Sequence, residues 1–364
     1  MSQLKVLFFG GYKADYPRNQ IAIHAMEKAG ITVEQLHDSH GFLWRFLPLL
    51  AGAVKKDFDA LWVGYSGHAD VLIAKIICLL KGKPLVFDMF VSHYDSEREY
   101  NPQGVGLFGS RTGDGEFRLA LTRFLDKLSC MLPDKVLADT EQHAEFLSCE
   151  FGVPKQKFSW FFAGANEKIM VPPKYPQKKG AFTVLFYGWV TPLHGFKYIV
   201  EAARLVEKMG GGINFVFIGD SRYFREFRDS PQKPGNAVFL PPVSHPELAA
   251  EISKATVCLG IFGTSGKASR VIPNKVFEPL AMGKPLITAS TPAVLPYLVH
   301  KRNALLVSQG SAREIADAII ALKKDPKLLA RISKGGRDLY SETFSEEKIG
   351  QKIKSVLEAV ARRK

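Results

Sequence analysis

Short apolar runs alternate with longer segments of helical period through the first half of the chain. Runs rich in β-branched and aromatic residues predict strands at residues 6–9, 32–36, 60–64, 85–90, 135–138 and 158–162. The spacing of apolar positions predicts helices near residues 19–29, 43–54, 71–80, 117–131 and 141–151. This alternation builds a parallel sheet covered by helices, so we expect one doubly wound domain over residues 1–166.

A segment rich in proline and lysine interrupts the alternation. Residues 168–180 hold three prolines and four lysines, which suit neither a regular helix nor a central strand, so we place a linker at residues 167–180. Beyond it, the same alternation predicts a second doubly wound domain over residues 181–345. Its expected strands lie at residues 183–187, 214–218, 237–240, 257–261, 285–288 and 304–307.

The chain from residue 311 onward is helical in pattern, with breaks at 325–326 and 343–345. We expect the last helix, residues 346–364, to pack back towards the N-terminal domain. The length of 364 residues also favours two domains over one. Two doubly wound domains joined by a short linker leave a cleft between the carboxyl ends of two sheets, where such folds bind ligands.

Positive charge is concentrated in the second half of the chain. Residues 1–164 carry 18 basic and 19 acidic side chains, whereas residues 165–364 carry 31 and 17, which accounts for the whole net charge of +13. Such a field attracts a phosphorylated ligand, an anionic lipid surface or nucleic acid; a solvated basic face is the alternative. Because no nucleic-acid-binding motif accompanies it, we expect no nucleic-acid partner.

The four cysteines lack the paired spacing of a zinc site or a redox dithiol. They stand in apolar stretches, so we expect small core residues at Cys78, Cys130, Cys149 and Cys258. Residues 1–11 do not have the pattern of a secretory leader, and the most apolar stretch, 71–80, is too short to cross a bilayer. We expect a cytoplasmic protein, with peripheral contact at the inner membrane face left open.

The most informative stretch is GTSGKASRVIPNKVFEPLAMGKPLIT, residues 263–288. A strand, a Gly/Ser-rich loop and a helix that begins near Asn274 together form an anion site, because free backbone amides and the positive helix end face the ligand. Lys267, Arg270 and Lys275 add positive charge, and Arg is able to hold a diphosphate bidentately. Glu278, one helical turn after Asn274, is suited to accept hydrogen bonds from a pair of ribose hydroxyls.

This stretch resembles the nucleotide-sugar-binding segment of glycosyltransferase family 4, whose members are retaining enzymes of the GT-B fold. In that family two Glu separated by seven residues mark the site. Glu278 matches the second, which holds the ribose, but Arg270 stands near the place of the first. The Pro-Asn-Lys sequence before the helix, with Glu three residues after Lys275, is similar to bacterial members. The departure leaves the identity of the donor sugar open.

The segment VLFYGWVTPLHGFKYIVEAARL, residues 184–205, is similar to the family's first strand, glycine-rich turn and helix beside the donor phosphates. Gly188, His194 and Gly195 fit that layout, which implies a donor-binding role for them. For His194, donation to a phosphate and capping of the helix both remain open. Gly219, which follows the strand NFVFI, fits the family's next glycine turn.

In the first domain, Gly10 and Gly11 resemble the family's flexible loop that approaches the donor sugar, although a plain turn is the alternative. The stretch VFDMFVSHYDSEREY, residues 86–100, is similar to a pattern of some bacterial relatives. It makes Asp88, His93 and Asp95 candidates near the acceptor or the scissile bond. A strand-end carboxylate satisfied by backbone amides is the alternative for Asp88.

Four further segments have simpler interpretations. Asp139 or Thr140 is expected to cap the helix that follows it. Residues 101–116 are either a long glycine-containing loop that covers a site or a disordered segment; Arg98, just before it, and Arg111 are candidates to meet an anionic acceptor. Residues 41–56 are either a membrane-contacting helix or a core helix. Asp57-Phe58-Asp59 has the form of a metal-binding motif but precedes a strand, so we expect no metal site and no cofactor.

The resemblance spans nearly the whole chain and implies an α/β protein of GT-B architecture, with two doubly wound Rossmann-like domains facing a central cleft. It implies a metal-independent retaining glycosyltransferase that moves a sugar from a UDP- or GDP-sugar to a glycan, lipid-linked or small-molecule acceptor. Expected catalytic residues are Asp95, His93, Arg270 and Lys275. The expected donor-binding residues are Gly10, Gly11, Gly188, His194, Gly195, Gly219, Lys267, Asn274, Lys275 and Glu278.

Two alternatives share this architecture: a sugar-nucleotide epimerase and a non-catalytic sugar-nucleotide-binding protein. A dinucleotide-dependent oxidoreductase is disfavoured, because neither opening strand leads into a Gly-x-Gly-x-x-Gly turn.

Overall fold

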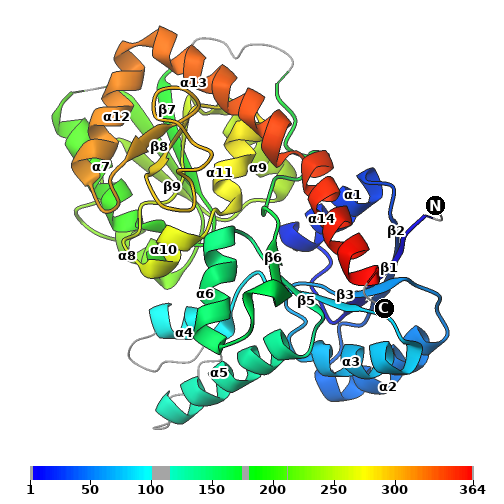
Figure 1. The fold of residues 1–364 in the computed structure, drawn as a ribbon. Coiled ribbons are helices and arrows are strands. Elements are labelled where there is room, and N and C mark those ends of the chain that lie inside the picture. Colours follow the sequence, from blue (N-terminus) through cyan, green and yellow to red (C-terminus); the bar gives the residue numbers. More distant parts are fainter. Residues whose placement is uncertain (1–2, 101–114, 174–179, 211, 363–364) are drawn as a thin grey trace. The chain divides into compact units, whose positions relative to one another are not determined.

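The computed structural model describes residues 3–100, 115–173, 180–210 and 212–362. The chain forms two compact units: unit 1 comprises Met1–Ala163 and Glu346–Lys364, and unit 2 comprises Gly164–Ser345 (Figure 1). Each unit contains a parallel six-stranded sheet with helices, so the predicted α/β class with two doubly wound domains is confirmed.

The sheet of unit 1 has the strand order β2-β1-β3-β4-β5-β6. Each strand ends within two residues of its predicted bounds, because the buried apolar runs that signal strands in the sequence are the strands themselves. The strands are β1 (Lys5–Gly10), β2 (Thr32–His37), β3 (Ala60–Val63), β4 (Leu85–Asp88), β5 (Lys135–Ala138) and β6 (Phe158–Trp160).

Six of the described helices of unit 1 match the helical pattern of the sequence; α4 does not, because its sequence is polar. Thr140 caps α6 by accepting a hydrogen bond from the His143 N–H at 3.0 Å, and the helix ends at Gly152 in the left-handed conformation. The helices are α1 (Pro17–Lys28), α2 (Phe42–Val54), α3 (Asp70–Lys81), α4 (His93–Tyr100), α5 (Gly115–Met131), α6 (Glu141–Phe151), the short 3-10 turn η1 (Lys155–Lys157) and α14 (Glu346–Ala361).

The last helix, α14, lies beside α1 in unit 1, although the two are more than 300 residues apart in sequence (Figure 1). Gly350 permits the close approach: a Cβ at this position would stand 2.1 Å from the carbonyl oxygen of Ala25. At the start of α14 the buried Glu346 carboxylate pairs with the Lys28 ammonium at 2.8 Å. The contact is therefore both a tight backbone packing and a partly buried ion pair.

A buried ion pair joins α1 to the carboxyl ends of the unit 1 strands. Arg18 and Asp88 are fully buried, and the guanidinium donates to both carboxylate oxygens at 2.9 and 3.0 Å. Arg18 also donates to the carbonyl oxygens of Ala138 and Phe161. Asp88 is thus satisfied by a side chain rather than by the backbone amides that its strand-end position suggested.

The sheet of unit 2 has the order β12-β11-β10-β7-β8-β9, again parallel throughout. All six strands lie within two residues of their predicted positions. They are β7 (Phe182–Tyr187), β8 (Ile213–Ile218), β9 (Ala237–Leu240), β10 (Val257–Leu259), β11 (Leu286–Ala289) and β12 (Leu305–Val307).

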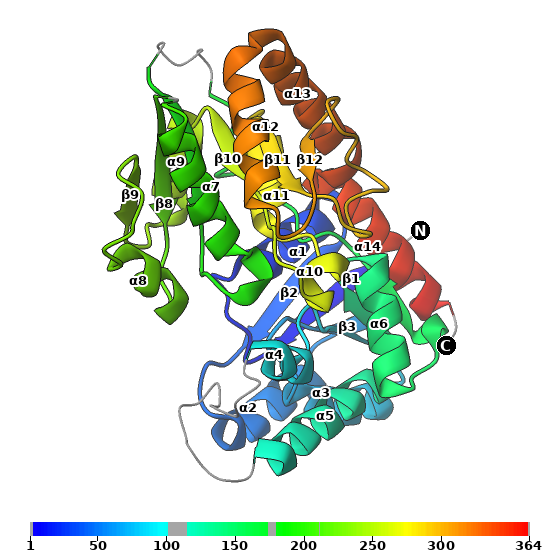
Figure 2. The ribbon, with the colours of Figure 1, turned by 90° about the vertical axis from the view of Figure 1, so that its left-hand side faces the viewer.

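In unit 2, α7 packs beside α12, and α11 packs against α13 (Figures 1 and 2). Val184 and Phe186 of β7 belong to the core that contains α7 and α12, so Leu185 and Tyr187 face the opposite side of the sheet. The helical elements are the 3-10 turn η2 (Pro192–His194), α7 (Phe196–Lys208), α8 (Arg222–Arg228), α9 (His245–Lys254), α10 (Gly266–Arg270), α11 (Asn274–Ala281), α12 (Ala312–Lys324), α13 (Pro326–Leu339) and the π-helical turn η3 (Tyr340–Phe344).

Residues 164–173, which include the first part of the predicted linker at 167–180, belong to unit 2 and pack on its helices. The side-chain amide of Asn274 donates to the Gly164 carbonyl at 3.1 Å, the Tyr340 hydroxyl donates to the Ala165 carbonyl at 3.3 Å, and Met170 is buried. Residues 164–173 are therefore held in place by specific contacts. The proline-rich composition of this segment does not predict these contacts.

The cysteine prediction is correct at three positions: Cys78, Cys130 and Cys258 are buried, but Cys149 is exposed. Cys149 lies on α6, whose buried face is formed by His143, Ala144, Leu147 and Phe151. Cys149 lies on a different face of this helix, so it is exposed even though its neighbours in sequence are apolar. Across the described helices, none combines the length and apolar character needed to cross a membrane.

Candidate functional site

The strand order of unit 2 reverses direction between β7 and β10. From β7 the chain moves outward through β8 to β9, and after β10 it moves the other way through β11 to β12. In an open parallel sheet, this reversal creates a crevice at the carboxyl ends of the two central strands, where ligands bind. The segments that follow β7 and β10, including η2, α10 and α11, contain seven of the ten residues predicted to bind the donor.

Lys275 is the central side chain of this site. It is the second residue of α11, and its side chain is buried, with only 5% of the residue exposed. Its Nζ lies 4.4 Å from the ring centre of Phe186, and a Cβ on Gly188 would stand 3.4 Å from it. Within the described residues, this Nζ has no hydrogen-bond partner. An unpaired buried ammonium costs several kcal/mol, which indicates that a ligand supplies the partner.

Glu278 lies one turn further along α11 and is 5% exposed. Its carboxylate accepts a hydrogen bond of 2.7 Å from the Tyr187 hydroxyl at the end of β7. Burial raises the pKa of Glu278 to about 7, although the Tyr187 hydrogen bond and the charge of Lys275 act in the opposite direction. Burial also lowers the pKa of Lys275 to about 7, against the effect of Glu278. Both groups therefore titrate near neutral pH.

His194 is the last residue of the 3-10 turn η2, in the segment that follows β7. Its Nδ1 accepts a hydrogen bond from the Thr191 N–H at 3.0 Å and so caps the turn η2. Burial, together with the charge of Lys275, holds the pKa of His194 well below its usual range. The neutral ring with an acceptor at Nδ1 carries its proton on Nε2. His194 therefore caps the short turn η2 and not the helix α7, whose N-cap residue, Gly195, makes no side-chain capping bond, and the same geometry leaves Nε2–H as a donor.

Glycines allow the loops around Lys275 to touch. A Cβ on Gly219 would lie 2.3 Å from the Gly188 carbonyl oxygen, and a Cβ on Gly195 would lie 2.5 Å from the Phe262 carbonyl carbon. Gly188 and Gly195 also have positive φ angles of 107° and 63°. Only glycine meets both demands without strain, so these residues shape the site through its backbone.

The remaining predicted residues of unit 2 surround the start of α11. Lys267 is buried on α10, and Arg270, half-buried at the end of α10, bends back until its Nη1 is 3.0 Å from where a Gly266 Cβ would stand. No side chain caps α11 at Pro273, so its first N–H groups are suited to an anion. Asn274 instead holds Gly164 through its amide nitrogen.

The predicted residues of unit 1 do not form a single cluster. Gly10 ends β1 and Gly11 follows it, and the Gly11 N–H donates to Asp70 at 2.9 Å. Asp70 is fully buried and also pairs with Arg45 at 2.8 Å, whose guanidinium lies against Gly11. The loop thus packs on an ion pair, a contact that the sequence did not indicate.

His93 and Asp95 are two residues apart at the start of α4, but they lie in different surroundings. His93 is exposed, and its Nε2 lies 3.2 Å from His68 Nδ1. Asp95 is 1% exposed and pairs with Arg98 at 3.5 Å. The catalytic roles predicted for both stay predictions; the accessible position of His93 suits contact with a ligand better.

Sequence patterns missed several residues of these sites. Tyr187 is an ordinary apolar strand residue in the sequence, and only its meeting with Glu278, 91 residues away, gives it a role. His68 and Asp126 of unit 1 likewise had no motif around them.

Arg98 pairs with Glu150, and Arg111 lies outside the described residues. Asp57 pairs with Lys5, and the Asp59 carboxylate accepts from the Lys5 N–H.

Comparisons with known proteins agree with the fold. Residues 169–339 match the family model for group 1 glycosyl transferases. The chain is 22% identical over 331 residues to WcaL of Escherichia coli K12, a putative colanic acid biosynthesis glycosyltransferase, which covers 86% of this chain and 74% of that protein.

Two solved structures share the fold over nearly the whole chain. HepE of Anabaena, in complex with UDP-glucose, has a TM-score of 0.71 and 15% identity, covering 98% of this chain and 100% of that chain. Sucrose-phosphate synthase of Thermosynechococcus elongatus has a TM-score of 0.69 and 14% identity, covering 100% of each. The protein therefore has the GT-B fold, and its residues 169–339, which include Lys275 and Glu278, match the model of group 1 glycosyl transferases.

Proposed function

We propose that the protein is a glycosyltransferase that transfers a sugar from a nucleoside diphosphate sugar, a UDP- or GDP-sugar, to a glycan, lipid-linked or small-molecule acceptor. The observation that carries this proposal is the buried, unpartnered Nζ of Lys275 beside the carboxylate of Glu278 at the switch point of unit 2. A diphosphate supplies the missing anion, and ribose hydroxyls supply donors to the carboxylate. The UDP-glucose bound to HepE, which has the same fold, supports this choice of ligand.

Each residue of the site has a distinct role in this proposal. Lys275 and Arg270 neutralise the diphosphate, and His194 donates from Nε2 to a phosphate oxygen. The turn at Gly188 lets the backbone approach the ligand closely. Glu278, held by Tyr187, binds the ribose. Lys267 adds positive potential from α10, and Asn274 fixes the start of α11 through Gly164.

These groups also provide the chemistry. Cleavage of the bond between sugar and phosphate develops negative charge on the leaving diphosphate, and prearranged cations and N–H donors stabilise that charge most in the transition state. We propose that this positive charge makes a metal ion unnecessary. We also propose retention of the anomeric configuration, with the leaving phosphate accepting the acceptor's proton on the same face of the sugar.

A thermal-shift screen of UDP, GDP, ADP and their sugars tests the donor site, and mass spectrometry with an acceptor panel tests transfer. We expect selective stabilisation by one nucleotide and its sugar, lost in Lys275→Met and kept in Lys327→Met, an exposed lysine on α13. Conversion of the sugar nucleotide without acceptor indicates an epimerase, and binding without turnover indicates a non-catalytic protein. Undiminished transfer in EDTA and an NMR assignment of the product anomer test the metal and the stereochemistry.

We further propose that α2 contacts a membrane surface. Leu43, Trp44 and Leu47 on this helix are 84, 81 and 70% exposed, whereas Leu49 and Ala53 on its other side are buried. Helices with such an exposed apolar side bind the interface of a bilayer. We expect the protein to co-sediment with vesicles of phosphatidylcholine and phosphatidylglycerol, and Trp44→Arg to co-sediment less. Equal co-sedimentation of the protein and the Trp44→Arg variant contradicts the proposal.

A further inference from the structure

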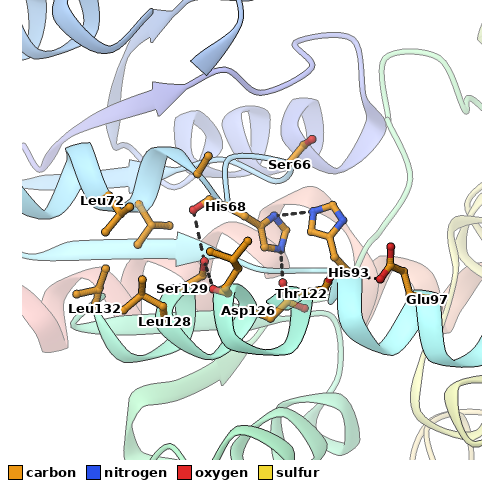
Figure 3. Close-up of a pocket in the computed structure, with 13 residues that line it drawn as sticks. Ser66, His68, Leu72, His93, Glu97, Thr122, Asp126, Leu128, Ser129 and Leu132 are labelled. Atoms are coloured by element: carbon orange, nitrogen blue, oxygen red, sulfur yellow. Dashed lines mark hydrogen bonds and ion pairs between the residues drawn. The ribbon is translucent and has the colours of Figure 1, made fainter. Parts of the chain in front are cut away.

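A pocket of about 460 Å³ lies within unit 1, between α3 and α5 (Figure 3). It shares no residue with the donor site of unit 2. Its volume falls in the range that small-molecule sites occupy. Of the residues predicted from the sequence, His93 lines it.

The two ends of the pocket differ in chemistry. Figure 3 shows Leu72, Leu128 and Leu132 gathered at one end, and His93 and Glu97 at the other. The apolar end comes from α3 and α5, whose side chains face each other across the pocket. The polar end comes from the segments that follow β3 and β4, with Thr122 and Asp126 added by α5. A ligand that fills it must therefore be amphipathic along its length.

Hydrogen bonds within the chain fix the polar end. His93 Nε2 lies 3.2 Å from His68 Nδ1, and the Thr122 hydroxyl donates to Glu97 at 3.1 Å. The Asp126 carboxylate accepts from the Ser92 hydroxyl at 2.6 Å, and its other oxygen lies 3.9 Å from His68 Nε2. Burial and the neighbouring His93 hold the pKa of His68 well below its usual range, so His68 is neutral.

The charge balance selects the kind of head group. Two carboxylates, Glu97 and Asp126, line the pocket, and its lining among the described residues contains no Lys or Arg; Arg118, 3.8 Å from Glu97, lies outside the lining. An anionic head such as phosphate would meet these carboxylates without a cation in the lining. Hydroxyl groups instead fit, because Glu97 accepts hydrogen bonds and an imidazole offers both a donor and an acceptor.

We propose that the pocket between α3 and α5 binds a neutral amphiphile, with its hydroxylated head at His93 and Glu97 and its hydrocarbon chain between Leu72, Leu125 and Leu128. This assignment rests on the proposed function, since the amphiphile is then the sugar acceptor. Leu72 and Leu125 are 43 and 49% exposed at the rim, so the chain enters over apolar side chains rather than through a polar gate.

Calorimetric titration with octyl glucoside below its micelle concentration tests the assignment. Methyl glucoside, which lacks the chain, and octyl phosphate, which carries an anionic head, are the comparison ligands. We expect octyl glucoside to bind at least about tenfold more tightly than either, because both the chain and the neutral head contribute. Leu72→Arg should weaken binding about tenfold or more, while the matched control Leu79→Arg, on the same helix but outside the pocket, should leave it unchanged.

His93→Ala tests the head group. It should weaken octyl glucoside binding and leave octanol binding unaltered, a difference that general destabilisation of unit 1 does not produce. Equal binding of octyl phosphate and octyl glucoside, or equal effects of the Leu72 and Leu79 variants, overturns the assignment. The assignment is also wrong if gel filtration shows a dimer that only Leu72→Arg converts to monomers. In that case a second copy of the chain fills the pocket.

The donor screen separates this inference from the proposed function. Nucleotide binding without octyl glucoside binding defeats only the pocket assignment. Binding of octyl glucoside without any response to sugar nucleotides defeats only the glycosyltransferase proposal. A product that is one sugar heavier than octyl glucoside, formed only with a sugar nucleotide, supports both.

Discussion

The Tyr187 hydroxyl donates a 2.7 Å hydrogen bond to the Glu278 carboxylate, which joins the end of β7 to the middle of α11. Burial alone favours the protonated form of Glu278, and Tyr187 opposes that effect by binding the carboxylate. Tyr187 is therefore a positioning residue that keeps Glu278 both oriented and ionisable.

Tyr187→Phe should weaken nucleotide binding and move its acidic limb to higher pH. Without the hydroxyl, burial raises the pKa of Glu278 further, and the carboxylate is free to rotate. We expect a loss of about three- to tenfold in affinity at neutral pH, equivalent to one hydrogen bond. Titration of UDP or GDP across pH measures it, with the exposed Tyr223→Phe as control. An unchanged pH profile contradicts this role.

Lys275→Met should weaken nucleotide binding about 10- to 150-fold yet leave the ligand-free protein at least as stable. The substitution removes one charge-assisted contact to phosphate, worth about 1.5–3 kcal/mol, and also removes a buried group that lacks a partner. Urea unfolding and calorimetric titration measure the two effects separately. A large loss of stability in the ligand-free variant would show that Lys275 has a structural role instead.

Nucleotide affinity should be bell-shaped in pH, with its maximum near neutrality. Glu278 must lose a proton to accept from ribose, and Lys275 must keep one to bind phosphate, and both have a pKa of about 7 in the ligand-free protein. Glu278→Gln should weaken donor binding and remove the acidic limb; Lys275→Met should remove the alkaline limb. A variant that retains both limbs contradicts the assignment.

The same two groups should make the ligand-free protein least stable near pH 7. The pKa of Glu278 is raised from 4.5 to about 7 on folding, so its contribution to stability is lost as pH rises through that interval. The pKa of Lys275 is lowered from 10.5 to about 7, so its contribution is lost as pH falls through that interval. Urea midpoints at about pH 5, 7 and 9 should show a dip that the Lys275→Met/Glu278→Gln variant lacks.

Gly350→Val should loosen α14 from α1. A Cβ at this position would collide with the backbone oxygen of Ala25, which cannot move aside as a flexible side chain would. We expect a loss of about 1–3 kcal/mol in the free energy of unfolding, typical of overpacking. Gln351→Ala, at an exposed neighbour, is the control. Faster hydrogen exchange in α14 and α1 should accompany the loss, and unchanged exchange would exclude this contact as its cause.

The sequence by itself determined the twelve strands and most helices, because buried parallel strands are continuous apolar runs and amphipathic helices carry a regular period. It also indicated Lys275 and Glu278, since both stand in one short motif on one helix. These are local signals, encoded within about two turns of chain.

Only the tertiary structure decided which distant residues meet. The Tyr187–Glu278 hydrogen bond, the Arg18–Asp88 ion pair and the packing of α14 on α1 each join segments far apart in the sequence. The same holds for the pocket between α3 and α5, whose polar end takes His68 from the loop after β3 and His93 from the start of α4. No local pattern encodes such contacts, because burial and partner choice depend on how the sheets and helices pack.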